Sequence, residues 1–564
     1  MKSLNFYLLL IVALATTGSC GEDFLDETPL DFFSTENAFA NVDDFNASVN
    51  NLYGRVRSEF FTVNDYNPME YLYRTDVGFQ ITTAVPNLDA DFSPNSGIIS
   101  YHWGQLYKIV SEANTIISRA PDSELSEEQQ LSFEAKARFF RAFAFRSLAY
   151  LYGGVPILTE ELTGEKVDFV RASREEVYAL VITDLLFAID NLPDITEVQD
   201  GEVSRTVAQH LLAEVYLADG QFEEAMRVAT EVIDNPATAL MTERFGTRST
   251  EEPGDVYWDL FRRNNQNRGA GNTEALWVIQ SETDVLGGGA VSTDRAGSYQ
   301  LERVHAPLIR DVQIDGVSAF LWPAGDYTGG RGVGFLTPST YFIDEAYADD
   351  PDNDIRNANH NFVRKFESNN PASPYFGQLI DFHDLPENTT GTSGVPITSG
   401  VPNRGMYPYQ SKATTPYNHP PALYENPGNY PWHLKNSAGG TYTDQYMFRL
   451  AGTYLLRAEA YLGMGKPAEA VADINVVRAR SNAAAASAGE MDIDYILDER
   501  MREFGMEEKR MFTLMRLGKL YDRIKMCNPF YADGIQPYHN LWPIPASEIE
   551  RNRGGSLEQN EGYN

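Results

Sequence analysis

AEVYLADGQFEEA, from Ala213 to Ala225, aligns without gaps to AEAYLGMGKPAEA, from Ala458 to Ala470. Both copies begin and end with alanine, and both carry a tyrosine three places and a glycine seven places after the first alanine. Small side chains at the two ends let a pair of helices approach closely, the tyrosine fills the gap between them, and the glycine turns the chain. The repeat therefore predicts two close helical hairpins.

The spacing within each copy resembles that of a tetratricopeptide helix pair, although alanine-rich helical hairpins of other kinds can imitate it. The two copies are separated by residues 226–457. Because one repeat unit cannot bury its apolar face alone, we expect both copies to belong to one helical scaffold. A long insert is then expected to interrupt that scaffold.

Other helical patterns lie toward the N-terminus. Residues 131–152 place apolar side chains at helical spacing and precede Gly153 and Gly154, which predicts a long amphipathic helix. A further helix is predicted from residue 175 to Pro193. The predicted fold class is mostly α, a tetratricopeptide-like helical scaffold with a loop-rich insert that contains short strands.

The insert, residues 242–446, is rich in Gly, Pro, Asn, Asp and Tyr. Such composition is typical of loops, and EALWVIQ, residues 274–280, is expected to be one of its short strands. A loop-rich stretch of this length inside a compact protein usually carries function. Its notable aromatic residues are Tyr299, Trp322, Tyr327, Tyr407, Tyr409, Tyr430 and Trp432.

The first residues form the pattern of a secretion signal. Lys2 is basic, residues 4–14 are apolar, and small residues precede Cys20. The apolar run is shorter than the roughly 20 residues of a membrane helix, so we expect residues 1–19 to be a cleaved signal peptide. Cys20 is then the predicted lipid attachment site. The alternative is an ordinary signal peptide that happens to be followed by a cysteine.

Composition narrows the possible partners. The chain has 564 residues, 43% of them hydrophobic, and only two cysteines, Cys20 and Cys527, so an apolar core must stabilise it without an intramolecular disulfide. A net charge of −35 argues against nucleic acid and anionic lipid headgroups as partners. Aromatic residues make up 12% of the chain, and exposed rings can stack on sugar faces.

The nearest candidates for a glycosidase carboxylate pair are Glu503 and Glu507. Basic residues stand at helical spacing around them, so we interpret both as members of structural ion pairs. The expected partners are Arg500, Lys509, Arg510 and Arg516.

Motifs for metal or cofactor chemistry are incomplete. Asp350, Asp352 and Asp354 resemble the start of a calcium loop, but Ile355 and Asn361 stand where that loop needs glycine and glutamate, so a solvated acidic turn is expected. The glycines at 330, 332 and 334 lack the strand and helix of a phosphate site. The chain has neither GxSxG nor HExxH, and Cys527 has no recognisable histidine partner. We therefore predict no enzyme activity, no cofactor and no metal.

Five blocks in order resemble the SusD/RagB family of outer-membrane nutrient-binding lipoproteins. CGEDFLDETP is similar to the lipidated N-terminus of that family, and the stretches from Trp103 and from Glu134 are similar to its two most recognisable helices. ERMREFGMEEKRMFTLMRLGK and LWPIPASEIERNRGGSLEQNEGY are similar to its closing signature. The resemblance implies a helical scaffold that covers a SusC-like TonB-dependent barrel and carries oligosaccharides or other nutrients.

The family blocks are mainly scaffold, so Trp103, Asn114, Arg138 and Arg141 are expected to be structural. Ligand residues in the family lie in variable loops and cannot be transferred by motif. Candidate ligand contacts therefore come from the loops of this chain, where exposed rings can also simply cover the scaffold. The candidates are Tyr73, Arg74, Phe79, Trp322, Tyr327, Tyr430 and Trp432.

The expected organisation is one compact domain after the signal peptide. It divides into an N-terminal helical region at 20–241, the insert at 242–446 and a C-terminal helical region at 447–564. The expected function is glycan binding at the outer membrane for a SusC-like transporter, with peptide or another nutrient as the alternative ligand. Two further alternatives are a secreted glycoside hydrolase on an α-helical scaffold and a tetratricopeptide interaction adaptor.

Overall fold

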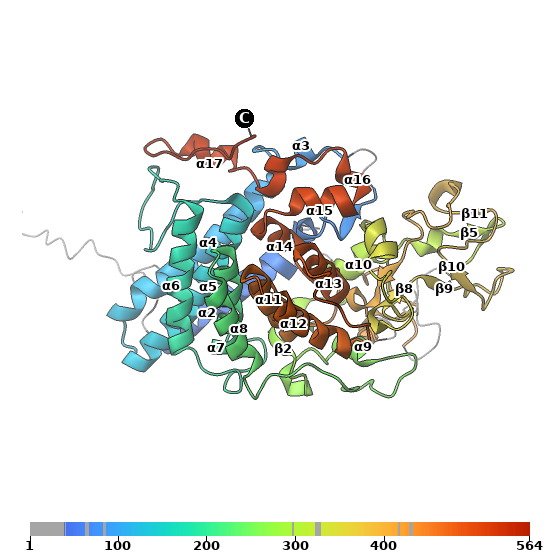
Figure 1. The fold of residues 1–564 in the computed structure, drawn as a ribbon, viewed down its shortest axis with the longest axis horizontal. Helices are drawn as coiled ribbons and strands as arrows, with labels where there is room; N and C mark the ends of the chain where they lie inside the picture. The colour runs from blue at the N-terminus through green and yellow to red at the C-terminus, as the bar shows by residue number, and fades with distance from the viewer. Residues whose placement is uncertain are drawn as a thin grey trace, which may run out of the picture.

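The computed structural model describes residues 39, 41–61, 67–82, 86–295, 298–321, 329–415, 418–427 and 433–563. The fold is mostly helical, with short strands concentrated in the middle of the chain, so the predicted fold class is confirmed (Figure 1). The principal helices are α2 (Val42–Phe61), α4 (Gly97–Arg119), α5 (Glu127–Tyr152), α6 (Arg174–Asn191), α7 (Arg205–Ala218), α8 (Phe222–Ile233), α11 (Leu450–Gly463), α12 (Pro467–Arg480), α13 (Ile493–Phe504), α14 (Arg510–Arg516) and α15 (Leu520–Cys527).

Capping residues set the ends of the predicted N-terminal helices. α5 begins four residues earlier than predicted because Ser126 and Gln129 form a capping box, and it ends at Gly153 with φ 77°. Buried polar contacts then join the neighbouring helices. Arg141 of α5 bonds Asp184 of α6 at 2.8 Å and Asn114 of α4 at 2.9 Å. Arg141 and Asn114 therefore have the structural role that the sequence predicts.

The two copies of the repeat form the predicted hairpins, α7 with α8 and α11 with α12. Their turns are closely alike. Gly220 and Gly465 adopt φ 74° and 71°, which favours glycine. The next backbone N–H donates to the repeat tyrosine carbonyl in each copy, Gln221 to Tyr216 at 2.8 Å and Lys466 to Tyr461 at 2.9 Å.

The two hairpins pack against each other, although the whole insert separates them in sequence. His210 of α7 bonds Thr453 of α11 at 2.8 Å, and Arg457 of α11 bonds Thr230 of α8 at 3.1 Å. A Cβ placed on Gly463 would lie 2.5 Å from the Phe222 ring, so α11 and α8 approach as closely as glycine allows. The prediction of one repeat scaffold is confirmed.

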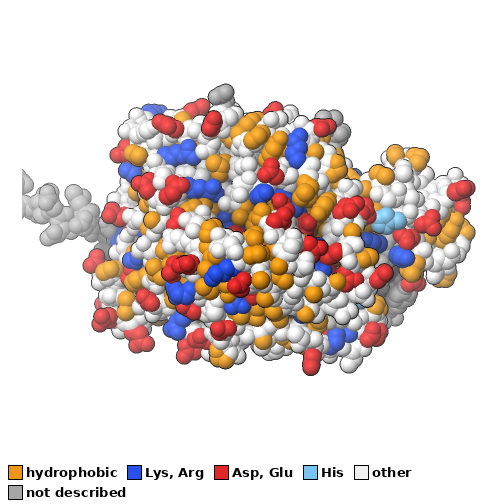
Figure 2. Space-filling model, viewed as in Figure 1, with side chains coloured by type: hydrophobic (Ala, Val, Ile, Leu, Met, Phe, Trp, Pro, Cys, Tyr) orange, Lys and Arg blue, Asp and Glu red, His pale blue; other side chains and the backbone are white. Residues whose placement is uncertain are grey.

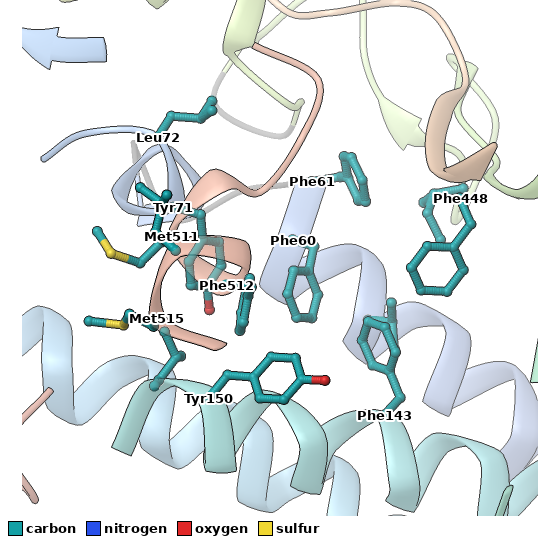
Figure 3. Packing of buried hydrophobic residues seen from close by; sticks show 14 of the residues in the cluster. Phe60, Phe61, Tyr71, Leu72, Phe143, Tyr150, Phe448, Met511, Phe512 and Met515 are labelled. Carbon is teal, nitrogen blue, oxygen red and sulfur yellow. The ribbon is translucent and has the colours of Figure 1, made fainter. Parts of the chain in front are cut away.

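Aromatic rings from both ends of the chain meet in one core (Figure 3). The ring of Phe60 in α2 lies 5.3 Å from that of Phe143 in α5 and 5.8 Å from that of Phe512 in α14. Tyr71 packs on Phe512 at 4.6 Å between centroids. Helices near the N-terminus and near the C-terminus therefore share their buried surface.

The insert leaves and re-enters the scaffold through neighbouring strands. β2 (Ala275–Ile279), which is the predicted strand, pairs antiparallel with β13 (Gln445–Arg449), directly before α11. Several small sheets project beyond the scaffold as the arm at the right of Figure 1. The other strands are β1 (Gly78–Gln80), β3 (Glu282–Thr283), β4 (Gly289–Ala290), β5 (Gln313–Ile314), β6 (Val317–Ser318), β7 (Leu336–Pro338), β8 (Phe362–Val363), β9 (Lys365–Glu367), β10 (Leu379–Asp381), β11 (Thr389–Thr390) and β12 (Tyr409–Gln410).

Charged side chains are spread over the face of the molecule shown in Figure 2. Asp and Glu side chains occur across the whole of the face in Figure 2, with Lys and Arg between them. Within the described ranges, none of the helices combines the length and apolarity needed to cross a bilayer.

Candidate functional site

The structure describes three of the seven predicted ligand contacts. Tyr73 is buried, and Phe79 is buried against Phe530 with ring centroids 4.6 Å apart. Both rings lie in the protein interior and not on its surface. The other predicted contacts, Trp322, Tyr327, Tyr430 and Trp432, lie outside the described residues, as does Cys20.

Arg74, the third described candidate, is tied to the scaffold by two carboxylates. Its side chain bonds Asp91 at 2.8 Å and also pairs with Glu70. Burial lowers the pKa of Arg74, but Glu70 and Asp91 raise it by more, so the group is held in its charged form. Its backbone adopts φ 55°, an uncommon conformation for a residue other than glycine. In this arrangement Arg74 orders the loop before β1.

A two-stranded sheet connects this N-terminal loop with the insert. β1 pairs antiparallel with β7, which places Phe79 opposite Thr337, and Ile81 extends the pairing through a 3.1 Å bond to Phe335. Phe335 in turn donates its N–H to Val304 in the short helix α10 (Leu301–His305) at 2.9 Å. The structure therefore brings the segment that contains Tyr73 and Phe79 beside the segment that follows Trp322 and Tyr327 in the sequence.

Helix α10 is held by Glu302, whose side chain is fully buried. Its carboxylate accepts a bond from Thr415 at 2.8 Å and contacts His419 Nε2 at 2.7 Å. Gly330, with φ 94°, passes so close to this carboxylate that any side chain at this position would collide with it. We name the surface formed by α10 and residues 329–335 and 433–443 the α10 face.

Two loop ends meet on the α10 face. Arg331 Nη2 donates to Asn436 Oδ1 at 3.2 Å. Arg331 comes four residues after Tyr327, and Asn436 comes four residues after Trp432. The segments that lead out of these two aromatic loops are therefore joined.

A satellite apolar cluster supports this face from within the insert. It consists of Ala290, Leu423, Tyr424, Leu434, Ala438 and Tyr442. Three of the insert aromatics singled out in the sequence, Tyr299, Tyr407 and Tyr409, are also buried. Tyr407 donates to the carbonyl of His305 at 2.9 Å, which fixes the end of α10. These rings stiffen the face and are not available for stacking on a ligand.

The carboxylates proposed as a possible glycosidase pair are structural, as predicted, but their predicted partners are wrong. Glu503 is fully buried, and its partners are Arg356, Arg449 and Arg480, all distant in sequence. Helix α13 ends at Phe504, and the chain turns at Gly505 with φ 46°. Glu507 therefore does not follow Glu503 along one helix, and it pairs with Arg449 and Lys412.

The acidic triplet differs from the predicted solvated turn. Only Asp352 is exposed. Asp354 is buried and pairs with Arg356 at 2.7 Å, and Asp350 accepts the N–H of Ala484 at 2.7 Å. Nowhere among the described side chains do three or more His, Cys, Asp or Glu converge in a way that could hold a metal ion.

Residues 316–563 match the family described as "SusD family", and residues 23–217 match the family described as "Starch-binding associating with outer membrane". A SusD-like protein, P2, from Formosa agariphila is 26% identical over 99% of this chain and 100% of its own length.

Solved structures share the fold. A laminarin-binding SusD-like protein superposes with a TM-score of 0.63 at 21% identity, over 93% of this chain and 100% of its own. Surface glycan-binding protein A from Bacteroides thetaiotaomicron, in complex with laminarihexaose, superposes with a TM-score of 0.65 at 18% identity, over 92% of this chain and 99% of its own.

Proposed function

The chain belongs to the SusD/RagB family, and we propose that it binds an oligosaccharide or polysaccharide at the cell surface and delivers it to a SusC-like TonB-dependent transporter. The protein is a binding protein and not an enzyme. We further propose that it is an outer-membrane lipoprotein that is anchored through a lipid on Cys20 and faces the outside of the cell.

One observation carries the proposal of glycan binding. The family match at residues 316–563 includes residues 329–335 and 433–443, which form most of the α10 face. This face is rigid because the buried hydrogen bonds of Glu302 and the packing of the satellite apolar cluster fix its segments in place. Rigid support lowers the entropy that a binding surface loses when a ligand docks.

The proposed ligand contacts are Trp322, Tyr327, Tyr430 and Trp432. Tyr327 and Trp432 each precede, by four residues, a residue of the joined pair Arg331 and Asn436. The contact between Arg331 and Asn436 joins the described segments that follow these two aromatic residues in the sequence, which supports the proposal. The buried residues Tyr73 and Phe79, with Arg74, are proposed to shape the neighbouring loop.

Calorimetry of the soluble protein that lacks residues 1–20, against neutral oligosaccharides of several linkages, tests the proposal. We expect a dissociation constant between about micromolar and about millimolar, because a carrier must release its ligand to the transporter. Binding of peptides and of no saccharide would favour the alternative nutrient. Cleavage of a saccharide by the purified protein would contradict the assignment as a binding protein.

Co-purification tests delivery. An affinity-tagged protein should retain a TonB-dependent transporter after mild detergent extraction of the outer membrane. Retention of soluble proteins alone would favour the interaction-adaptor alternative.

A further inference from the structure

A second concave site lies on the helical scaffold. It is lined by residues of α4, of the connection between α5 and α6, and of the C-terminal segment that includes α17 (Ala546–Arg551). Figure 1 shows α17 at the upper left of the molecule, away from the projecting arm at the right. Every described residue that lines this site comes from outside 242–446, so the site is separate from the α10 face. We name it the α4 pocket.

Apolar side chains predominate in the α4 pocket. The rings of Trp103, Tyr107 and Phe169 line it together with several leucines, of which Leu162 is 47% exposed. Tyr107 and Phe169 are half-buried, so part of each residue remains accessible. The pocket has a volume of about 260 Å³, near the small end of the usual range for ligand sites. It therefore suits one small unit of a ligand and not a long segment.

Hydrogen bonds between the three segments hold the walls of the pocket. The Tyr107 hydroxyl donates to the carbonyl of Pro156 at 2.7 Å, which ties α4 to the α5–α6 connection. The Asn552 side chain accepts the N–H of Phe169 and donates to its carbonyl, both at 2.8 Å, which ties the C-terminal segment to the same connection. Because the walls are joined in the absence of a ligand, binding there costs little ordering of the protein.

Charged groups of both signs stand beside this apolar lining. Lys166 pairs with Asp168 at 2.6 Å, and Arg551 pairs with Glu548 at 3.0 Å. Lys166, Glu548 and Arg551 line the pocket. Exposed pairs of this kind are weak, so their members can turn toward a ligand. The two pairs balance in charge and offer both donors and acceptors, which matches a neutral ligand with hydroxyl groups better than an anion or a cation.

We propose that the α4 pocket is a second saccharide site that takes one unit of a neutral glycan. The C–H face of a sugar ring would pack on the rings of Tyr107 and Phe169, while its hydroxyls reach the charged groups beside them. This inference rests on the proposed glycan-binding function and adds a second point of attachment to it. Two points of attachment raise the avidity for a polysaccharide that reaches both.

Gly104 offers a way to close the pocket without disturbing the fold. It lies within α4 and lines the pocket, and no described atom lies within 4 Å of a Cβ added there. Gly104→Leu therefore extends a side chain into open space, and leucine favours a helix more than glycine does. Gly54→Leu in α2 is the matched control, because Gly54 is also half-buried within a helix and has the same open surroundings.

Calorimetry of the soluble protein with neutral hexasaccharides of glucose, mannose, galactose and xylose tests the inference. We expect the hexasaccharide that binds best to occupy two sites on the parent and on Gly54→Leu, but one site on Gly104→Leu. Phe169→Ala, which removes one ring of the pocket, should weaken the second site by about fivefold. Circular dichroism and thermal melting show whether each variant is folded.

The outcomes separate this inference from the proposed function. If a hexasaccharide occupies only one site on the parent, or if Gly104→Leu keeps both sites, the second-site inference is wrong while glycan binding stands. If Gly104→Leu does not fold, unchanged binding by Phe169→Ala overturns the inference in the same way. If Gly104→Leu binds saccharides like the parent but no longer retains the transporter, the pocket docks a protein instead. If no saccharide binds, the proposed function and the inference fail together.

Discussion

Glu503 Oε1 lies 2.9 Å from Arg449 Nη1, and neither side chain is exposed to solvent. Arg356 and Arg480 complete the set of guanidinium groups around this carboxylate. Glu503→Gln would keep the volume but remove the charge, leaving these arginines without their shared anion. We expect a loss of about 3–5 kcal/mol in the free energy of unfolding, measured by guanidinium chloride denaturation.

A surface pair provides the control for this prediction. Glu224 and Arg227 in α8 are both about half exposed, with side-chain exposures of 47% and 52%. Glu224→Gln should cost less than about 1 kcal/mol. Equal losses for the two variants would show that the buried network is not what stabilises the fold.

The close contact of α11 with α8 predicts that replacing Gly463 with alanine will destabilise the fold. Alanine in place of helical glycine normally stabilises by up to about 1 kcal/mol. Gly463→Ala should instead destabilise by about 1–3 kcal/mol, because the new methyl group would meet the Phe222 ring at 2.5 Å. Gly54→Ala in α2, where nothing lies within 4 Å of the added Cβ, should stabilise. Stabilisation by both substitutions would contradict the close approach of the repeats.

Stability should depend on pH through Lys412, which donates to the Tyr257 hydroxyl and to the backbone carbonyl of Glu503, each at 2.9 Å. Burial lowers its pKa to about 8 from 10.5, against the opposing effect of Glu507. Between these values the unfolded chain binds more protons than the folded chain, so this residue makes the protein more stable as pH rises from 8 toward 10.5. Below pH 8, Lys412 is protonated in both the folded and the unfolded chain, so the full free-energy cost of burying its charge opposes folding.

Denaturation of the parent and of Lys412→Met at several pH values isolates this effect. The stability of the variant relative to the parent should fall as pH rises through the window. Lys466→Met, at an exposed position, should change in parallel with the parent. If the free energies of unfolding of the parent and of Lys412→Met differ by the same amount at every pH, the pKa of Lys412 is not shifted by folding.

The lipid anchor gives a localisation prediction. Cys20→Ala should release the protein from the membrane fraction, because acyl chains at that position supply the proposed attachment. Cys527→Ala is the matched control, since Cys527 is buried. If Cys20→Ala stays with membranes in cells without the transporter, the anchor lies elsewhere.

The aromatic loops give a binding prediction. Trp322→Ala, Tyr327→Ala and Trp432→Ala should each weaken glycan affinity by on the order of 1 kcal/mol, about fivefold, through loss of stacking. Phe376→Ala, at a ring 55% exposed on the projecting arm, serves as the control. If a glycan binds and all three loop variants retain full affinity, the loop around Arg74 becomes the next candidate.

Local sequence signals predicted the scaffold well. The hairpins at Ala213 and Ala458, the helix that ends at Tyr152 and the strand β2 all depend on short-range spacing and turn residues. These signals are visible in one stretch of chain because helix periodicity and glycine turns act over a few residues.

The site could be predicted only in part. Tyr73 and Phe79 look like exposed loop rings in the sequence, but Phe530, more than four hundred residues away, buries Phe79. Glu503 finds its partners on three other segments for the same reason. Pairing across such distances leaves no periodic trace in a single sequence.

The pairing of β2 with β13 affects how the insert can change during evolution. Leu450, the first residue of α11, donates to the Glu274 carbonyl at 2.9 Å, so the stretch between them begins and ends at one point of the scaffold. Doubling the length of such a loop costs only about 0.6 kcal/mol. Insertions, deletions and exchanges in the parts of it that do not pack on the scaffold leave the spacing of α8 and α11 unaltered. Recognition can therefore diversify among the descendants of one ancestor while they inherit the helical frame unchanged.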